Sequence, residues 1–241
     1  MEETLSSIVA RISSTVSAFY NSFLGQTHSQ ARLNAIASYD QSNELFKAFL
    51  SSEMMYSCAL WADAEGGVRG DLFSSPTPGG LEAAQLRKIR HVLNKARVRP
   101  GHRVLEFGSG WGGLAIEAAT SYGCEVDTLT LSVEQKVLAE ERIRAAGVED
   151  RVRVHLLDYR EIPAEFEKAF DAFISIEMLE VTHFFLSAQL LLIRTPSQHV
   201  GPKHYNTYFK LVDFALKSRD AAVVVSASTF PEGRYSGYQY V

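Results

Sequence analysis

The stretch Arg103–Gly113 reads RVLEFGSGWGG and decides the expected fold. Val104, Leu105 and Phe107 form a short apolar run of the kind found in buried parallel strands. Glycines then alternate with other residues, and the next six residues, LAIEAA (114–119), suit a helix. A strand, a glycine loop and a helix in this order open a nucleotide-type crevice, because glycines permit a tight turn and the close approach of a ligand.

The spacing of these glycines indicates whether the loop suits a dinucleotide or another ligand. A dinucleotide fingerprint has the spacing G-x-G-x-x-G, with an acidic residue about 20 residues later for the ribose. Here the third glycine comes one position early, and the next strand ends at Thr128–Ser132 without an acid. Glu106 stands two residues before the first glycine, so the pattern E-x-G-x-G-x-G resembles motif I of the S-adenosylmethionine (SAM) methyltransferases. In that motif the acid faces the cationic methionine end of SAM. The alternatives are an ordinary glycine turn in an unrelated α/β domain and an NAD oxidoreductase.

Composition sets outer limits on the function. The chain has 241 residues, of which 46% are hydrophobic and 22% charged, as is usual for a soluble globular protein with one α/β domain and additions. The net charge of -4 gives no reason to expect nucleic acid as a partner. Cys58 and Cys124 cannot form a disulfide framework, which fits a cytoplasmic location. No metal site, secretory signal or membrane-spanning helix is expected.

Helical and strand patterns alternate along the chain. Before the glycine loop, helices are predicted over Leu5–Phe23, around Leu45–Phe49 and over Leu81–Ala96, with a loop over Gly66–Gly80. After it, strands are predicted at Gly123–Leu131, Val152–Leu157, Phe170–Ile176 and Ala221–Ser226, and helices at Val133–Ala146, capped by Ser132, and at Tyr205–Leu216. This alternation predicts an α/β fold with a doubly wound, mostly parallel sheet. We divide the chain into an N-terminal helical or cap segment (1–80) and a ligand-binding domain (81–241).

Polar residues follow four of the predicted strands. They lie at 106–112, 130–135, 158–159 and 177–180. In a doubly wound sheet, ligands bind outside the carboxyl ends of the strands. The sequence therefore predicts that these four clusters converge on one edge of the sheet.

Six segments in order resemble one family. They are YDQSNELFKAFL, MMYSCALW, VLEFGSGWGGLAIEAA, TLTLSVEQ, LLDYREIP and SIEMLE. They resemble the cyclopropane fatty acid synthase family, which includes the mycolic acid cyclopropane synthases and plant and fungal relatives. The likeness runs from about Tyr39 to the C-terminus with one interruption. It implies a Rossmann-like SAM-dependent methyltransferase that adds a methylene across the double bond of an unsaturated acyl phospholipid, with peripheral membrane contact.

The resemblance also assigns residues. It implies SAM contacts at Tyr56, Ser57, Glu106, Gly108, Ser109, Gly110, Thr130, Leu131, Ser132, Gln135, Asp158 and Tyr159. It implies a bicarbonate ion, acting as base, that is held by Cys58 and Glu180, with the turn at His199 fixing Glu180. A base is needed because methyl transfer to an alkene leaves a cation that must lose a proton to close the ring. Without the resemblance, Cys58 is interpreted as a small buried residue and Glu180 as a helix-start carboxylate.

The sequence departs from the family at two places. The family runs E-H-V-G-P-K, whereas here Val181–Gln198 separates Glu180 from His199. We interpret 181–198 as an insert or a retained in-frame intron, which transcript sequencing tests, and a genuine apolar loop is the alternative. Family members also continue beyond the residue that corresponds to Val241, so the last strands are expected to be missing and turnover by this chain to be weak or absent.

Two alternative functions share the predicted fold. Plant relatives of the family methylate alkaloid nitrogens, so a small-molecule N-methyltransferase is the first alternative. An inactive, truncated SAM-binding remnant is the second. Release of S-adenosylhomocysteine that depends on lipid separates the lipid methyltransferase from both.

Overall fold

Five parallel strands form one sheet in the protein. The computed structural model describes residues 42–67, 80–179 and 204–227. The strands are β1 (Arg103–Phe107), β2 (Glu125–Thr130), β3 (Val152–Leu156), β4 (Ala172–Ile176) and β5 (Ala222–Ser226). Their order across the sheet is β3-β2-β1-β4-β5, and every neighbouring pair is parallel. The predicted doubly wound α/β fold is confirmed.

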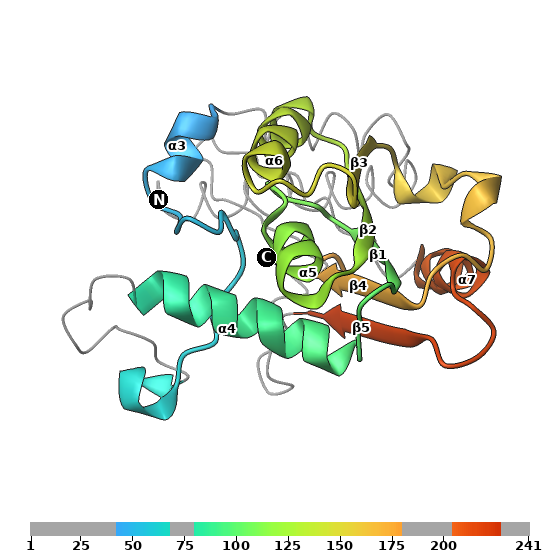
Figure 1. Ribbon diagram of the computed structural model, residues 1–241, viewed down its shortest axis with the longest axis horizontal. Helices are drawn as coiled ribbons and strands as arrows, with labels where there is room; N and C mark the ends of the chain where they lie inside the picture. Colours follow the sequence, from blue (N-terminus) through green and yellow to red (C-terminus); the bar gives the residue numbers. More distant parts are fainter. Residues whose placement is uncertain (1–41, 68–79, 180–203, 228–241) are drawn as a thin grey trace, which may run out of the picture.

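Helices cover both faces of the sheet. Figure 1 shows α4 (Gly80–Lys95), α5 (Gly113–Tyr122) and α6 (Val133–Ala145) on one side and α7 (Tyr205–Ala215) on the other. The remaining short elements are α3 (Asn43–Lys47) and the 3-10 helices η1 (Asp63–Glu65), η3 (Tyr159–Glu161) and η4 (Ala164–Phe166). The Ser132 side chain accepts a hydrogen bond from the Gln135 N–H and caps α6, as predicted.

Two apolar cores sandwich the sheet. On the side of α4, α5 and α6, the buried side chains include Ile89, Leu93, Leu114, Ala139 and Ile143. On the side of α7, the core is largely aromatic and contains Phe107, Phe166, Phe170, Phe173 and Tyr208. Because β1 is covered on both faces, four of its five residues are buried, and the continuous apolar run that predicted it follows from that position.

The strand order reverses at β1. The chain winds outward from β1 through β2 to β3, then returns to place β4 on the other side of β1. At such a reversal the loops after the two central strands diverge and leave a crevice at their carboxyl ends. The glycine loop that follows β1 lies at this point.

The segment 42–62 packs against the glycine loop and α6. Phe46 and Met54 are buried in a small core with Trp111 and Leu138. Of the apolar residues in 54–61, Met54 is buried, whereas Tyr56 and Leu60 are exposed. The predicted helix Leu5–Phe23 and the segment 181–198 lie outside the described residues, as does most of the Gly66–Gly80 loop. Within the described ranges, no helix is long and apolar enough to cross a membrane.

A buried carboxylate ties three strands together on the α7 side. Asp127 of β2 is 1% exposed. Its carboxylate accepts hydrogen bonds from Arg103 Nε (2.9 Å) and Arg153 Nε (3.2 Å) and lies 2.8 Å from His155 Nε2. Burial alone would raise the pKa of Asp127, but the hydrogen bonds from His155, Arg103 and Arg153 outweigh it and lower this pKa to about 2. The ionised carboxylate therefore stabilises the fold above a pH of about 4, and this contribution is lost as the pH falls towards 2.

We expect Asp127→Asn to lower the free energy of unfolding by about 2 kcal/mol at pH 7, because charge-assisted hydrogen bonds across β1, β2 and β3 are lost in a buried site. Urea unfolding measures the change. Glu125→Gln is the matched control, since Glu125 is exposed and pairs with the same Arg153, and it should change stability by less than about 0.5 kcal/mol. Equal losses for the two variants would contradict the prediction.

Candidate active site

A cavity of about 270 Å³ opens at the carboxyl ends of β1, β2, β3 and β4. Every described residue that the sequence assigned to SAM lines it, except Ser132. These residues are Tyr56, Ser57, Glu106, Gly108, Ser109, Gly110, Thr130, Leu131, Gln135, Asp158 and Tyr159. The structure thus brings the four predicted strand-end clusters together, with the segment 54–57 as a further wall. Their role as SAM contacts stays a prediction.

The glycine loop after β1 forms the floor of the cavity. The N–H groups of Gly108 and Ser109 both donate to the carbonyl oxygen of Leu129, at 3.0 and 2.8 Å, which fixes the loop to the end of β2. Gly108 adopts a φ of +88°, a conformation that side chains disfavour. A Cβ on Gly108 would also lie 2.9 Å from the sulfur of Met178. The glycine therefore allows Met178, from the end of β4, to close over the loop.

Glu106 is a buried acid in the wall of the cavity. It is 4% exposed, and its Oε2 accepts a hydrogen bond of 2.6 Å from Thr128 Oγ1 on β2. Burial raises the pKa of Glu106 to about 8, against the opposing effect of the Thr128 hydrogen bond. The carboxyl group is therefore largely protonated at pH 7 and ionises readily beside a cation. A raised pKa of this kind in a cavity is typical of a functional site.

Ser109 provides an observation that points to a ligand. Its Oγ is buried, and it has no hydrogen-bond partner within the part of the chain that the structure describes. A buried hydroxyl without a partner is unfavourable, so a polar group in the cavity would stabilise it. The open backbone at Gly110, where an added Cβ would meet nothing within 4 Å, leaves room for that group. The floor of the cavity thus fits a ligand with a cationic and hydrogen-bonding end.

The link from β2 to α6 holds a second polar wall in place. Thr130 Oγ1 donates to Gln135 Oε1 at 2.8 Å and accepts from the Ser132 N–H at 3.1 Å. Thr130 and Gln135 face the cavity. Ser132 is buried, caps α6 and is absent from the cavity lining among the described residues. Its observed role is therefore to hold Thr130 and Gln135 in place.

The end of β3 contributes Asp158, an acidic residue that the sequence analysis identified, and Arg160, a basic residue that it did not. Asp158 is 6% exposed, and its carboxylate accepts from Arg160 Nε at 2.9 Å and Arg160 Nη2 at 2.6 Å. Arg160 also lines the cavity. The Tyr159 ring packs against Phe107 and Tyr208, with ring centroids 5.7 and 5.4 Å away. This cluster presents a planar aromatic surface beside a neutralised carboxylate.

The wall formed by Tyr56 and Ser57 is fastened to α4. Gln85 Nε2 donates to the Ser57 carbonyl oxygen at 2.8 Å, and Lys88 Nζ donates to Ser57 Oγ. Burial lowers the pKa of Lys88 to about 8, while Glu177 and Cys58 act in the opposite direction. Tyr56 is 56% exposed and packs edge-on against Phe46. The half-buried amine of Lys88 and the buried amide of Gln85 thus hold this wall through both side chain and backbone.

The predicted catalytic residues are only partly placed. Cys58 is exposed, contrary to the small buried residue expected without the resemblance. It lines a second, more open hollow with Phe49, Leu50, Ala59, Trp61 and Leu81, and this hollow shares Met55, Tyr56 and Ser57 with the first cavity. Glu180 and His199 lie outside the described residues. The structure therefore does not test the predicted bicarbonate site.

Several residues of the cavity were given no individual role by sequence reasoning, although Glu177 and Met178 belong to the predicted cluster 177–180. Arg160, Glu177, Met178 and His204 line the cavity, and Lys88 lies directly behind it. For Arg160 the position two residues after Asp158 was a usable signal, because such a pair can form a local ion pair. Glu177 has a φ of +54°, which is uncommon for a side chain and frequent at functional sites.

The sheet order and this site define the fold class of the SAM-dependent methyltransferases. The model of the mycolic acid cyclopropane synthetase family matches residues 26–236. The chain belongs to that family.

Known proteins agree with this membership. The tuberculostearic acid methyltransferase UfaA1 of Mycobacterium tuberculosis is 42% identical over 218 residues, which cover 90% of this chain and 44% of that protein. The cyclopropane-fatty-acyl-phospholipid synthase of Escherichia coli is 36% identical over 179 residues, 74% of this chain and 36% of that protein. The crystal structure of mycolic acid cyclopropane synthase CmaA1 with SAH and CTAB matches with a TM-score of 0.61 and 25% identity, over 83% of this chain and 56% of that one. This chain thus spans less than half the length of these two curated relatives.

Proposed function

We propose that the chain is the SAM-binding part of a lipid C-methyltransferase that adds a methylene across the double bond of an unsaturated acyl phospholipid. The observation that carries the proposal is the single cavity in which Glu106, Ser109, Gln135 and Asp158 meet at the reversal of the strand order. Family membership and the named activities of the relatives support the lipid substrate.

The residues of the cavity suit the parts of SAM. SAM supplies an electrophilic methyl group when it is bound. Glu106 and the Ser109 hydroxyl, which has no partner among the described residues, fit its cationic methionine end, since one provides charge and the other a hydrogen bond. Gln135 and Asp158, beside the aromatic surface of Tyr159, fit the ribose and adenine. The chain's own contribution is to hold both ends so that the methyl group points at the acceptor.

The second hollow fits the hydrocarbon part of a lipid. Phe49, Leu50, Trp61 and Leu81 give it an apolar lining, and it shares Tyr56 and Ser57 with the first cavity. An acyl chain in this hollow would lie beside Tyr56 and Ser57, which line both spaces. Peripheral contact with a membrane, which would deliver that chain, is part of the proposal.

Bicarbonate is the proposed base. The resemblance assigns it to Cys58 and Glu180, with the turn at His199 fixing Glu180. Of these only Cys58 is described, and it lies close enough to the Lys88 ammonium for the two to interact electrostatically. The positive charge of Lys88 suits an anion at this place. Carbon dioxide depletion, followed by addition of bicarbonate to an active preparation, distinguishes a required anion from an incidental one.

Calorimetric titration of SAM into the purified 241-residue chain is the direct test. We expect a dissociation constant in the micromolar range and no binding of NAD, because β2, all of which is described, ends at Thr130 without the acid that a dinucleotide site has there. A chain that is folded by circular dichroism and binds no SAM would contradict the proposal.

The lipid step is tested separately. Vesicles of an unsaturated phosphatidylcholine should cause at most weak release of S-adenosylhomocysteine by this chain, whereas vesicles of its saturated counterpart should cause none. SAM binding without lipid-dependent release would leave this chain as a SAM-binding segment. The C-methyltransferase activity would then need the remainder of a longer protein or would be absent.

A further inference from the structure

One arginine joins two walls of the cavity that are far apart in sequence. Arg142 of α6 is half-buried. Its Nη1 donates to the carbonyl oxygen of Trp111 in the glycine loop, and its Nη2 donates to the carbonyl oxygen of Ser52 at 2.7 Å. Ser52 begins the segment that leads to Tyr56 and Ser57. Both acceptors are main-chain atoms, so the link fixes backbone positions and does not depend on the rotamer of an acceptor side chain.

The ring of Trp111 also contacts α3, next to the link between the glycine loop and the segment before Tyr56. The side chain is 1% exposed, and its centroid lies 4.6 Å from that of Phe46. Its Nε1 donates to Asn43 Oδ1 at 2.7 Å, and Asn43 Nδ2 donates to the Glu134 carbonyl oxygen on α6 at 3.2 Å. The ring therefore holds α3 against the glycine loop, while Arg142 holds the segment after α3.

Arginine suits this position better than any other cation. Its guanidinium is planar and directs several N–H donors in fixed directions, so that one group can satisfy two carbonyl oxygens at once. Burial lowers the pKa of Arg142, and the Glu53 carboxylate opposes this effect. Sequence reasoning gave no signal for this residue, because its partners are main-chain atoms 31 and 90 residues away.

We propose that Arg142 is a positioning residue of the site: it sets the separation between the glycine loop and the wall that carries Tyr56 and Ser57. The inference rests on the proposed function for its ligand, but the link between the two walls can be measured without a ligand. When the link is cut, Gln85 and Lys88 still hold Ser57 to α4. The domain should then stay folded while the wall shifts relative to the loop.

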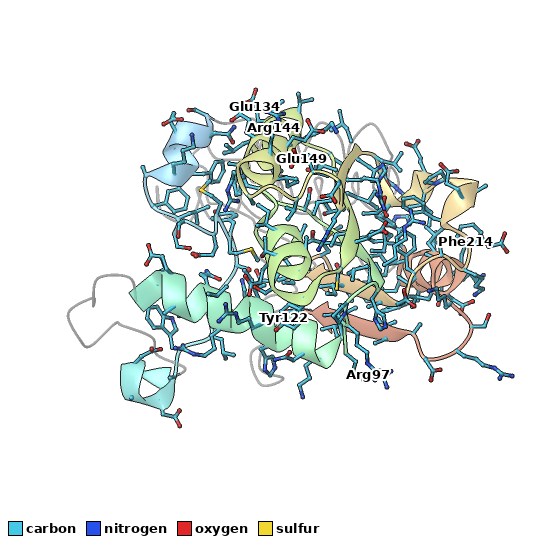
Figure 2. The ribbon with its side chains drawn as sticks, in the orientation of Figure 1. Arg97, Tyr122, Glu134, Arg144, Glu149 and Phe214 are labelled. Atoms are coloured by element: carbon cyan, nitrogen blue, oxygen red, sulfur yellow. The ribbon has the colours of Figure 1, made fainter. Side chains whose placement is uncertain are left out.

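Arg142→Met is the variant of choice, because methionine keeps an unbranched apolar stem and removes both donors. Arg144→Met is the matched control, since Arg144 is exposed on the same helix, as labelled in Figure 2. We expect the dissociation constant for SAM, measured by calorimetry, to rise about tenfold for Arg142→Met and to stay within twofold for Arg144→Met. Arg142→Lys, which can reach only one carbonyl at a time, should fall between them.

A fluorescence measurement tests the link in the absence of SAM. The chain contains two tryptophans, so a Trp61→Phe background leaves Trp111 as the single reporter. In this background, Arg142→Met should raise the acrylamide quenching constant of Trp111 at least twofold, because the segment 52–57, which Arg142 holds beside Trp111, is released. A residue that only stabilised the fold would leave quenching of the folded protein unchanged.

The outcomes test the positioning role of Arg142 separately from the proposed binding of SAM. If Arg142→Met changes neither SAM affinity nor Trp111 quenching, the positioning role is wrong. If the unaltered chain binds no SAM, the proposed function fails, and quenching alone decides the role of Arg142. If Arg142→Met does not fold, Arg142→Lys decides, and values equal to those of the unaltered chain overturn the inference.

Discussion

Replacing Glu106 by glutamine is expected to weaken SAM binding roughly 100-fold above pH 8 and to remove much of its pH dependence. The loss corresponds to about 3 kcal/mol, a usual value for removing one member of a buried charge pair. Glutamine retains the shape of the side chain and an oxygen that can accept from Thr128 Oγ1. The variant therefore removes the charge and little else.

The sign of the pH effect follows from the pKa of Glu106, which burial raises to about 8. A cationic ligand favours the ionised acid, so at pH 7 binding must release a proton. Affinity should then rise about tenfold between pH 7 and pH 9. The amino group of SAM titrates in the same range, so the informative quantity is the ratio of the two proteins' affinities at each pH.

Calorimetry in two buffers of different ionisation enthalpy measures the proton release directly. Thr128→Val is the companion variant: it removes the hydrogen bond that lowers the pKa of Glu106, so the release should move to higher pH. In the free protein, Glu106 stays protonated up to a pH of about 8, whereas in the unfolded chain it ionises at about 4.5. The free energy of unfolding therefore falls as the pH rises from about 4.5 to 8, and Glu106→Gln should be the more stable chain at pH 9. A pH profile for Glu106→Gln that matches the unaltered chain would show that Glu106 does not face the cation.

Gly113→Ala is expected to lower the free energy of unfolding by about 3 kcal/mol and to weaken SAM binding roughly 30-fold, which is about 2 kcal/mol. A Cβ at this first residue of α5 would lie 2.4 Å from the carbonyl oxygen of Glu53 and 3.1 Å from the Met55 sulfur. The carbonyl is main chain, so relief requires the segment 53–57 to move. That movement displaces Tyr56 and Ser57 from the cavity.

Thermal unfolding and SAM calorimetry check both parts of this prediction. Alanine is a better helix former than glycine, which works against the expected loss. Ser121→Ala on the exposed surface of the same helix controls for the change in helix propensity, and it should leave both quantities nearly unchanged. A Gly113→Ala chain as stable as the unaltered one would mean that the segment 53–57 is loosely placed.

The strands were predictable because each carries apolar residues, either in a run or in alternation with polar residues, between polar or glycine breaks. The prediction Val152–Leu157 corresponds to β3 at Val152–Leu156, and Ala221–Ser226 to β5 at Ala222–Ser226. The strand predicted from Phe170 begins at Ala172, because Phe170 instead forms an isolated bridge with Leu216. Strand order was not readable from local pattern, since it depends on pairing between residues far apart in the chain.

The residues of the site that follow strands could be predicted from the sequence. Those whose position depends on contacts between distant parts of the chain could not. Glu106, Thr130 and Asp158 directly follow or end apolar runs, so their convergence followed from the parallel sheet. Lys88 and Arg142 lie on helices among other charged residues, and each has a partner in the distant segment 51–57. No periodicity in the sequence marks such partners.

The strand order also has a consequence for how the sheet assembles. Pairing β1 with β2 joins Glu106 to Thr128, 22 residues later, whereas joining β1 to β4 spans a separation of 68 residues. Because the entropy lost on closing a chain loop grows with the logarithm of its length, the second closure costs about 1 kcal/mol more than the first. Growth of the sheet is therefore entropically cheapest from β1 towards β3, and the crevice between β1 and β4 is completed by the more demanding closure.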